Sequence, residues 1–152
     1  THDQYQNRFL NLLDYKTSKR LIVKYFAQGR YLAPALEEVS YFLRDRRTNE
    51  EHYIDPRLLD ILNTVYSKSR SNSPFSVVSA YRSMETNEDL RRYDRKVAKN
   101  SYHMQGKAID LFLPDVRLSR LRSIALSLRA GGVGYYPQDK FVHIDVGPVR
   151  YW

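Results

Sequence analysis

Two histidines and two aspartates stand at spacings that suit a metal site. His103 and Asp110 are seven positions apart, and Gly106 lies between them, where a turn can bring both side chains to one point. His143 and Asp145 follow two positions apart in a second apolar segment, and residues so spaced on a strand share one face. Two neutral imidazoles and one carboxylate, with a fourth position left to water, suit a catalytic zinc ion, whose natural chemistry is hydrolysis.

Each histidine alone is better interpreted as an ordinary core or surface residue. That interpretation weakens when the histidines are taken together, because a charged Asp110 inside an apolar strand needs a partner. A non-haem iron oxygenase also uses two histidines and one carboxylate, but its second histidine normally follows a His-x-Asp pair. Here His103 precedes the pair formed by His143 and Asp145, and no histidine follows that pair. The order argues against iron.

Three amphipathic segments predict the helices that would support these residues. They cover residues 33–43, 55–69 and 117–130. Pro34 suits the first turn of its helix, where a missing N–H costs nothing, and Asp55 can cap the second helix. Gly131 and Gly132 are expected to end the third helix.

Short apolar or alternating runs predict the strands. They cover residues 75–80, 107–113, 133–136 and 140–146, and residues 9–25 form a hairpin around a turn at 17–19. A polar, partly helical insert separates the first two of these strands, and the tight spacing of the last two favours an antiparallel pair. We therefore expect one α+β domain over residues 1–152, with residues 1–30 as an N-terminal hairpin or extension. A central antiparallel sheet would carry the site, with helices packed on one face.

Composition limits the partners and the metal ligands. The chain of 152 residues carries a net charge of +8, which attracts polyanions such as nucleic acid, anionic lipid or a carboxylate-rich polymer. No cysteine is present, so any metal must be held by histidines and carboxylates. We expect no nucleic-acid partner, because no nucleic-acid-binding motif accompanies the basic run at 44–47. We expect no transmembrane segment, since no apolar run approaches ~20 residues. We also expect a monomer.

Three strings of the sequence together carry a family resemblance. They are Val-Ser-Ala-Tyr-Arg-Ser at 78–83, Ser-x-His-x-x-Gly-x-Ala-x-Asp at 101–110, and Phe-Val-His-Ile-Asp-Val-Gly-Pro at 141–148. They resemble the M15-type zinc peptidases, and more narrowly the murein endopeptidase branch once catalogued as a domain of unknown function. The resemblance runs across most of the chain and includes residues 130–137. It implies the fold of hedgehog-type domains and D-Ala-D-Ala peptidases.

The resemblance also implies roles for individual residues. His103, Asp110 and His143 would bind Zn²⁺, and Arg82 would steady the carbonyl oxygen as it becomes an oxyanion. Without the motif, Arg82 would be interpreted as one surface charge among 25 Lys and Arg residues. Ser101 would contact substrate or shape the pocket, and a hydroxyl that stabilises the turn is an equal alternative.

Four tyrosines beside the motifs could line a glycan or peptide groove, namely Tyr81, Tyr102, Tyr135 and Tyr136. Among them Tyr102 is expected to bind substrate, although core packing explains most such tyrosines equally well. His2 and His52 lie outside the motifs and receive no role.

The general base is the point at which the sequence departs from the family pattern. Many relatives carry a glutamate three residues before the last histidine, where this chain has Lys140. A general base must reach the water on the metal. Asp145 is the favoured candidate, Asp139 could serve if its loop folds inward, and the reaction could also proceed with little help. Asp145 could instead orient His143 through the other ring nitrogen.

The expected function, from the resemblance, is zinc-dependent hydrolysis of peptide cross-links in peptidoglycan (murein). The direct diaminopimelate-to-diaminopimelate (3-3) link is the expected substrate, and carboxylates of the stem peptides suit the basic chain. The alternatives are a D,D-endo- or carboxypeptidase acting on 4-3 links, and a catalytically silent zinc domain that binds the wall or a partner protein. The expected location is the periplasm. A start at Thr1 without a methionine or a signal segment fits a trimmed or processed chain, and cloning would give the same start.

Overall fold

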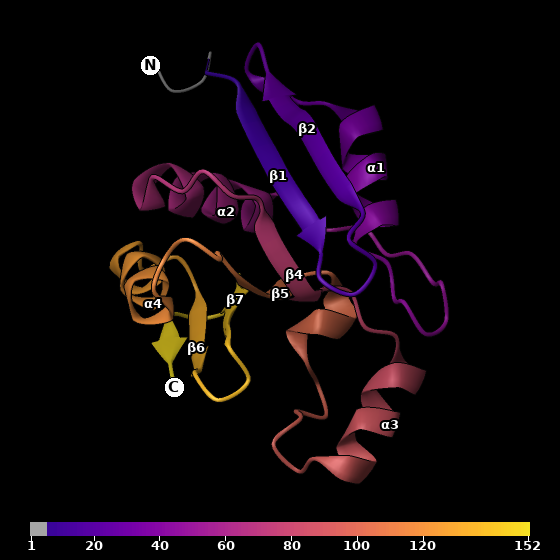
Figure 1. Cartoon of the computed structure of the whole chain (residues 1–152). Helices are drawn as coiled ribbons and strands as arrows, with labels where there is room; N and C mark the ends of the chain where they lie inside the picture. Colours follow the sequence, from indigo (N-terminus) through magenta and orange to yellow (C-terminus); the bar gives the residue numbers. More distant parts are fainter. Residues whose placement is uncertain (1–5) are drawn as a thin grey trace.

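Eight strands form one sheet in residues 6–152, the part of the chain that the computed structural model describes (Figure 1). In chain order the strands are β1 (Arg8–Asp14), β2 (Arg20–Ala27), β3 (Arg30–Tyr31), β4 (Phe75–Ser79), β5 (Ala108–Phe112), β6 (Gly132–Tyr136), β7 (Phe141–Asp145) and β8 (Arg150–Tyr151). The helices are α1 (Ala33–Phe42), α2 (Pro56–Ser69), α3 (Met84–Tyr93), the 3-10 helix η2 (Tyr102–Gln105) and α4 (Leu118–Ser127). Across the sheet the order is β3-β2-β1-β4-β5-β7-β6-β8.

The pairing of the strands is mixed. The pairs β1–β2 and β6–β7 are antiparallel hairpins, and β4–β5 and β5–β7 are also antiparallel. In contrast, β1–β4 and β6–β8 are parallel. A parallel pair needs a long crossover, which α1 and α2 provide between β1 and β4. The predicted α+β class is confirmed. The sheet is mixed rather than wholly antiparallel, because β1–β4 and β6–β8 pair in parallel.

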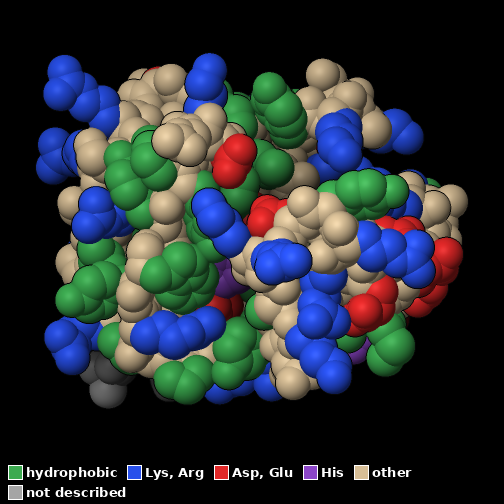
Figure 2. Space-filling view, turned by 90° about the horizontal axis from the view of Figure 1, so that it is seen from below, with side chains coloured by type: hydrophobic (Ala, Val, Ile, Leu, Met, Phe, Trp, Pro, Cys, Tyr) green, Lys and Arg blue, Asp and Glu red, His purple; other side chains and the backbone are tan. Residues whose placement is uncertain are grey.

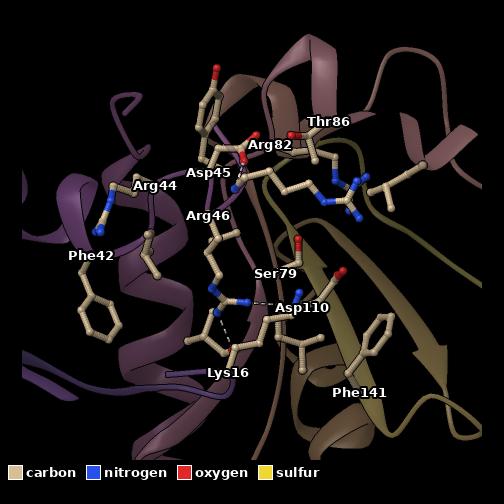
Figure 3. A pocket seen from close by; sticks show the side chains of 17 residues that line it. Lys16, Phe42, Arg44, Asp45, Arg46, Ser79, Arg82, Thr86, Asp110 and Phe141 are labelled. Carbon is tan, nitrogen blue, oxygen red and sulfur yellow. Dashed lines mark hydrogen bonds between the residues drawn. The ribbon is translucent and has the colours of Figure 1, made fainter. Parts of the chain in front are cut away.

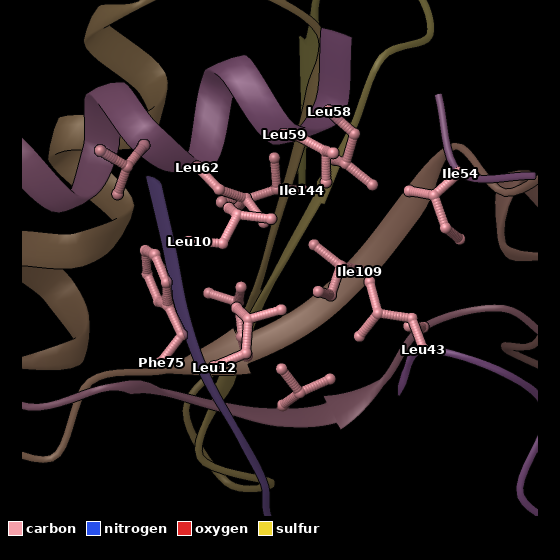
Figure 4. Packing of buried hydrophobic residues seen from close by; sticks show 14 of the residues in the cluster. Leu10, Leu12, Leu43, Ile54, Leu58, Leu59, Leu62, Phe75, Ile109 and Ile144 are labelled. Carbon is pink, nitrogen blue, oxygen red and sulfur yellow. The ribbon is translucent and has the colours of Figure 1, made fainter. Parts of the chain in front are cut away.

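The core lies on one face of the sheet, where α1, α2 and α4 contact the strands. Figure 4 shows Leu10 and Ile109 of the sheet facing Leu59 and Leu62 of α2. In contrast, α3 lies within the segment that joins β4 to η2 and stands away from the sheet (Figure 1). None of the helices formed by residues 6–152 has the length and hydropathy of a membrane span.

The helix ends follow local chemistry. Asp55 accepts a hydrogen bond from the backbone N–H of Arg57 and caps α2, as predicted. The predicted range of α4, residues 117–130, extends too far, because the helix ends at Ser127. Arg129 already adopts a left-handed conformation with φ of 48°, and Gly132 is the first residue of β6.

Candidate metal centre

The alternation of side chains along β5 and β7 separates the core from the site. Ile109 and Leu111 of β5 and Ile144 of β7 are buried in the apolar core. Asp110 lies between Ile109 and Leu111, and His143 lies next to Ile144, so both point to the opposite face of the sheet. They are also partners in the antiparallel register of β5 and β7, which places the two side chains next to each other.

His103 reaches the same place from η2. Ser101 caps this short helix, because its hydroxyl accepts a hydrogen bond from the backbone N–H of His103 at 3.1 Å. Gly106 ends it with φ of 67°, and a Cβ there would lie 2.0 Å from the carbonyl oxygen of Tyr53, so only glycine fits. The turn therefore holds His103 beside Asp110 of the strand that follows.

The three side chains share one carboxylate oxygen. His103 Nε2 and His143 Nδ1 lie 3.2 and 3.0 Å from Asp110 Oδ1. The other nitrogen of each ring is held from behind. His103 Nδ1 lies 2.7 Å from the carbonyl oxygen of Ala80, and His143 Nε2 lies 2.7 Å from Asp145 Oδ2. Such contacts fix the imidazoles and direct the remaining nitrogen of each ring towards Asp110, where a metal ion could bind.

The same group satisfies the distances that a bound ion requires. One ligand atom from each of His103, Asp110 and His143 can be chosen so that all lie within 4.8 Å of one another. Two of the three side chains are buried, and His143 is 9% exposed. Two nitrogens and one oxygen are donors that transition metals commonly accept. These residues could therefore hold a metal ion.

Charges in the site stabilise one another. Burial would raise the pKa of Asp110, but the charges and hydrogen bonds of His103 and His143 outweigh burial and lower it. Burial would lower the pKa of His143, but Asp110 and Asp145 raise it to about 9. The two carboxylates thus favour a positive charge at this position, whether it is carried by a proton or by a metal ion.

Asp145 lies behind His143 and has no exposed surface. Its Oδ1 accepts hydrogen bonds from the backbone N–H groups of Gly132 and Gly147 and from Arg150, and its Oδ2 accepts from His143 and Arg150. Burial would raise the pKa of Asp145, but the bonds from His143 and Arg150 lower it. The predicted general-base role does not fit this geometry. Asp145 contacts the ring nitrogen opposite the one that faces Asp110, and both its oxygens are occupied.

A pocket of about 290 Å³ adjoins the site, and both Arg82 and Asp110 line it (Figure 3). Arg82 Nη1 donates to Asn87 Oδ1 at 3.0 Å, and the backbone N–H of Arg82 donates to the carbonyl oxygen of His103. The turn after β4 is therefore tied directly to η2. Burial lowers the pKa of Arg82 while the charge of Asp110 opposes this effect, and a guanidinium stays charged in either case.

The wall of this pocket is basic. Besides Arg82, its cationic lining residues are Lys16, Arg44, Arg46 and Arg47. Arg46 is occupied by an ion pair with Asp14 at 2.9 Å and by bonds to two backbone carbonyls. Lys16 and Arg47 are exposed, and within residues 6–152 their side chains make no hydrogen bond or ion pair. Figure 2 shows Lys and Arg side chains around a hollow in which histidine and acidic side chains are visible.

Over residues 2–152 the sequence matches the M15 peptidase family described as peptidoglycan L,D-endopeptidase MepK. The chain belongs to the MepK family. It is 42% identical over 145 residues to the peptidoglycan L,D-endopeptidase MepK of Escherichia coli (strain K12), covering 95% of this chain and 80% of that protein. It is 44% identical over 147 residues to the probable peptidoglycan L,D-endopeptidase MepK of Haemophilus influenzae, covering 95% and 78%. The resemblance predicted from the three strings is thus confirmed.

A likeness to one solved structure is weaker. The crystal structure of Serratia marcescens L-Ala D-Glu endopeptidase ChiX aligns with 62% of this chain and 68% of its own. The identity is 18% and the TM-score is 0.42, which is too low to support an argument about the site. Membership of the MepK family therefore rests on the sequence.

The expected substrate residues of this MepK-family chain lie in different places. The hydroxyl of Ser101 is used to cap η2, which is the turn-stabilising alternative. Tyr102 is half-buried, and its ring lies 5.2 Å from the guanidinium carbon of Arg150. Tyr135 packs with the core and under Arg122, which removes it from a groove on the site face. Tyr81 lines the basic pocket.

The remaining residues considered from the sequence lie outside the site. Asp139 and Lys140 are exposed in the turn between β6 and β7. His52 hydrogen-bonds to the carbonyl oxygen of Tyr53 and stacks on Tyr81, with ring centroids 4.9 Å apart. His2 lies outside the described residues.

Two residues near the site were not predicted from the sequence, namely Arg150 in β8 and Trp152 directly after it. One signal for Arg150 existed, because a buried Asp145 in an apolar strand requires a cationic or hydrogen-bonding partner. No motif marked Trp152, which lies against His143 with ring centroids 5.2 Å apart.

Proposed function

We propose that this chain is a zinc-dependent endopeptidase that hydrolyses peptide cross-links in peptidoglycan. One observation carries the proposal: the carboxylate of the His-Asp-His group lines the same pocket as the Arg82 guanidinium. Membership of the MepK family supports peptidoglycan as the substrate. The names of the relatives support an L,D-peptide bond, and thus the 3-3 diaminopimelate cross-link. The proposed location is the periplasm, where this polymer lies.

Zinc is the proposed metal, with His103, Asp110 and His143 as its ligands. Imidazole nitrogen and carboxylate oxygen are common zinc ligands, and the chain contains no cysteine that could compete. A bound zinc ion polarises a carbonyl group and lowers the pKa of a bound water towards ~7. The contribution of the protein is to orient both imidazoles before binding, through the carbonyl of Ala80 and the carboxylate of Asp145.

Arg82 is proposed to stabilise the scissile carbonyl oxygen as negative charge develops on it. Its guanidinium lies on the pocket wall with Asp110 and is held by Asn87. A fixed donor that meets charge developing only in the transition state accelerates the reaction rather than tightening substrate binding.

Proton transfer is proposed to proceed without a dedicated carboxylate base. The acidic residues that line the pocket are Asp45 and Asp110. Asp45 is 2% exposed and accepts hydrogen bonds from three backbone N–H groups. Asp145 is occupied behind His143, and Asp139 is exposed in the β6–β7 turn. The third alternative from the sequence, a reaction with little help from a base, fits this arrangement best.

The basic pocket wall supports an anionic peptide as substrate. Stem peptides of peptidoglycan end in carboxylates, and diaminopimelate adds another next to the cross-link. Lys16 and Arg47 are exposed at the pocket and could pair with such groups. Surface pairs of this kind contribute little affinity each, so they would select and orient substrate more than they would hold it.

The function is tested by digestion of purified cross-linked muropeptides with zinc present, read by chromatography and mass spectrometry. The proteins compared are the unmodified chain, His143→Ala, and Asp115→Asn, which alters an exposed aspartate outside the ligand group. Conversion of dimers to monomers by the first and third proteins alone supports the proposal, and loss of 3-3 rather than 4-3 dimers names the bond. If all three proteins fold and none cuts any dimer, a silent zinc-binding or wall-binding domain replaces the enzyme.

If Arg82 stabilises the oxyanion, its removal should lower the rate of hydrolysis but leave zinc binding unchanged. Arg82→Ala is expected to lower the turnover of muropeptide dimers by about 10²–10³-fold, the effect typical of a lost oxyanion donor. Zinc content should stay the same, because Arg82 contacts none of the three ligand side chains through a hydrogen bond in residues 6–152. Arg82→Lys should recover part of the rate. Loss of zinc together with activity would instead make Arg82 a structural part of the metal site.

A further inference from the structure

The guanidinium of Arg150 lies directly behind the candidate metal centre. Arg150 Nη1 donates to Asp145 Oδ1 at 3.0 Å, and Arg150 Nη2 donates to Asp145 Oδ2 at 2.8 Å. The same Oδ2 accepts the hydrogen bond of His143 Nε2 at 2.7 Å. Oδ1 has backbone partners as well, whereas Oδ2 has only His143 and Arg150 among the described residues. Arg150 therefore fixes the oxygen that faces His143.

Aromatic rings hold the guanidinium of Arg150. Its Cζ lies 5.2 Å from the ring centroid of Tyr102 and 5.0 Å from that of Trp152, distances typical of cation–π contacts. Trp152 also lies against His143 and donates its indole N–H to the hydroxyl of Tyr136 at 2.6 Å. We refer to Tyr102, Arg150 and Trp152 together as the clamp.

The backbone attaches the clamp to the edge of the sheet. The strand β8 pairs with β6 in parallel, with Gly132 opposite Arg150. The backbone N–H of Trp152 donates to Val133, and the N–H of Tyr135 donates to the carbonyl of Trp152. The position of Arg150 is therefore set by the sheet and does not depend on its side-chain contacts alone.

Three glycines leave the space that the clamp fills, namely Gly132, Gly134 and Gly147. A Cβ at these positions would lie 2.3 Å from Arg150, 2.7 Å from the Trp152 ring and 2.7 Å from the Tyr102 ring, respectively. None of these three glycines has a positive φ, so the backbone conformation does not require glycine there. Glycine is required at these positions because the clamp approaches the strands too closely for a Cβ atom.

We propose that Arg150 is a positioning residue of the metal centre. It holds Asp145 so that this carboxylate orients His143, with Nδ1 towards Asp110 and His103. The inference rests on the proposed metal site and adds a determinant outside the three sequence motifs. Without Arg150, the buried carboxylate of Asp145 would lose both side-chain bonds from its cationic partner and could rotate away from His143. Loss of a partner that orients a metal ligand typically lowers metal affinity by about 10–100-fold.

The test measures zinc affinity by competition with a chromogenic chelator, on the full chain. Arg150→Gln is expected to bind zinc about 10–100-fold more weakly, and Arg150→Lys should recover part of the loss. Arg8→Gln is the matched control, because Arg8 also pairs with an aspartate, Asp60 at 3.0 Å, and lies 4.0 Å over the ring of Phe26. It should reduce stability without changing zinc affinity.

Trp152→Leu provides a second variant in case Arg150→Gln does not fold. It removes one ring of the clamp and the contact with His143, while the ion pair of Arg150 stays, so a loss of a few-fold in zinc affinity is expected. If the unmodified protein binds zinc and the Arg150 and Trp152 variants bind it equally well, the inference is overturned and the proposed function stands. If the unmodified protein binds no zinc, both fall together.

Discussion

The two faces of β5 and β7 are almost equally buried but are built from opposite chemistry. On the core face, Ile109 and Ile144 are 0% and 1% exposed among other apolar side chains. On the site face, Asp110 and His143 are 6% and 9% exposed, and they bind each other. Burial alone therefore does not distinguish the core from the site. The difference is that the polar atoms of the site are satisfied by one another and by two groups behind them, the carbonyl of Ala80 and the carboxylate of Asp145.

This difference separates stability from metal binding within one strand. Ile109 and Asp110 are neighbours in the sequence and point to opposite faces. Removing apolar volume on the core face destabilises the fold in proportion to the cavity that remains. Removing the charge of Asp110 on the site face takes away a proposed metal ligand and the group that stabilises positive charge on His103 and His143. Paired substitutions at the two positions can therefore test the comparison.

The largest effect is expected on the site face. Asp110→Asn keeps the size of the side chain and removes its negative charge, so zinc content and muropeptide hydrolysis should both collapse. A metal supplies several kcal/mol of transition-state stabilisation, which corresponds to a loss of roughly 10³-fold or more in rate. The two losses are measured by the zinc content after gel filtration and by the rate of dimer cleavage. Asp115→Asn, at an exposed aspartate bonded to Ser71, is the control and should behave like the unmodified protein. Retained zinc in Asp110→Asn would contradict the ligand assignment.

The next effect belongs to the core face. Ile109→Ala should lower the free energy of unfolding by about 2–5 kcal/mol, because it leaves a cavity beneath α2. Zinc affinity of the folded fraction should not change, since the backbone register of Asp110 and His143 is kept. Denaturant unfolding followed by circular dichroism gives the first quantity, and chelator competition gives the second. Ile22→Ala, at a side chain 61% exposed, should change stability by less than about 0.5 kcal/mol. A selective loss of zinc in Ile109→Ala would show that the two faces are coupled.

The sequence predicts both faces of these strands for a physical reason. Residues 107–113 and 140–146 are short apolar runs that predict strands, and a polar residue within each run, Asp110 or His143, stands out as a site candidate. Asp55 with Pro56 marks the start of α2. The three ligand candidates converge in the structure because two of them are register partners and the third follows from a turn that requires Gly106. These features are local, and local patterns are what a single sequence carries.

The rest depends on contacts between distant segments. The parallel pairing of β1 with β4 cannot be inferred from either strand, because both read as ordinary buried strands. The strand β8 has two residues, too few for a periodic pattern, and it carries Arg150 to Asp145. The role of Asp145 was open for the same reason. The sequence is compatible with Asp145 either as a general base or as a group that orients His143. Only the position of the Asp145 oxygens behind His143 distinguishes these roles.

A third buried carboxylate, Asp45, sharpens the comparison because it lines the pocket but lies outside the ligand group. Asp45 accepts hydrogen bonds from the backbone of Ser83, Arg47 and Thr48. Burial would raise the pKa of Asp45, but these bonds and the Thr86 hydroxyl outweigh burial and lower it to about 2. A lowered pKa stabilises the fold above the unfolded value of about 3.9, and this contribution is lost as the pH falls through about 2.

Asp45→Asn should therefore lose stability at pH 7, by about 1.5–3 kcal/mol for hydrogen bonds to a buried charge. Between pH 4 and pH 2 the unmodified protein should lose stability faster than the variant, and the two unfolding curves should converge. Unfolding in urea at a series of pH values measures both effects. A variant with the same pH dependence as the unmodified protein would place the acid-sensitive group elsewhere.

The smallest effect is expected at the exposed rim of the pocket. Arg47→Ala should lower kcat/KM for cross-linked dimers by a few-fold, because an exposed ion pair with a substrate carboxylate contributes about 1 kcal/mol or less. The difference should shrink at high salt and should vanish for dimers whose diaminopimelate carboxylates are amidated. Arg30→Ala removes the same charge at the exposed edge strand β3, far along the sheet from β5. If both variants lose activity equally, the net charge of the chain attracts the substrate and the pocket wall selects nothing. If only Arg47→Ala responds, and only to free carboxylates, the basic wall recognises the group beside the bond that is cut.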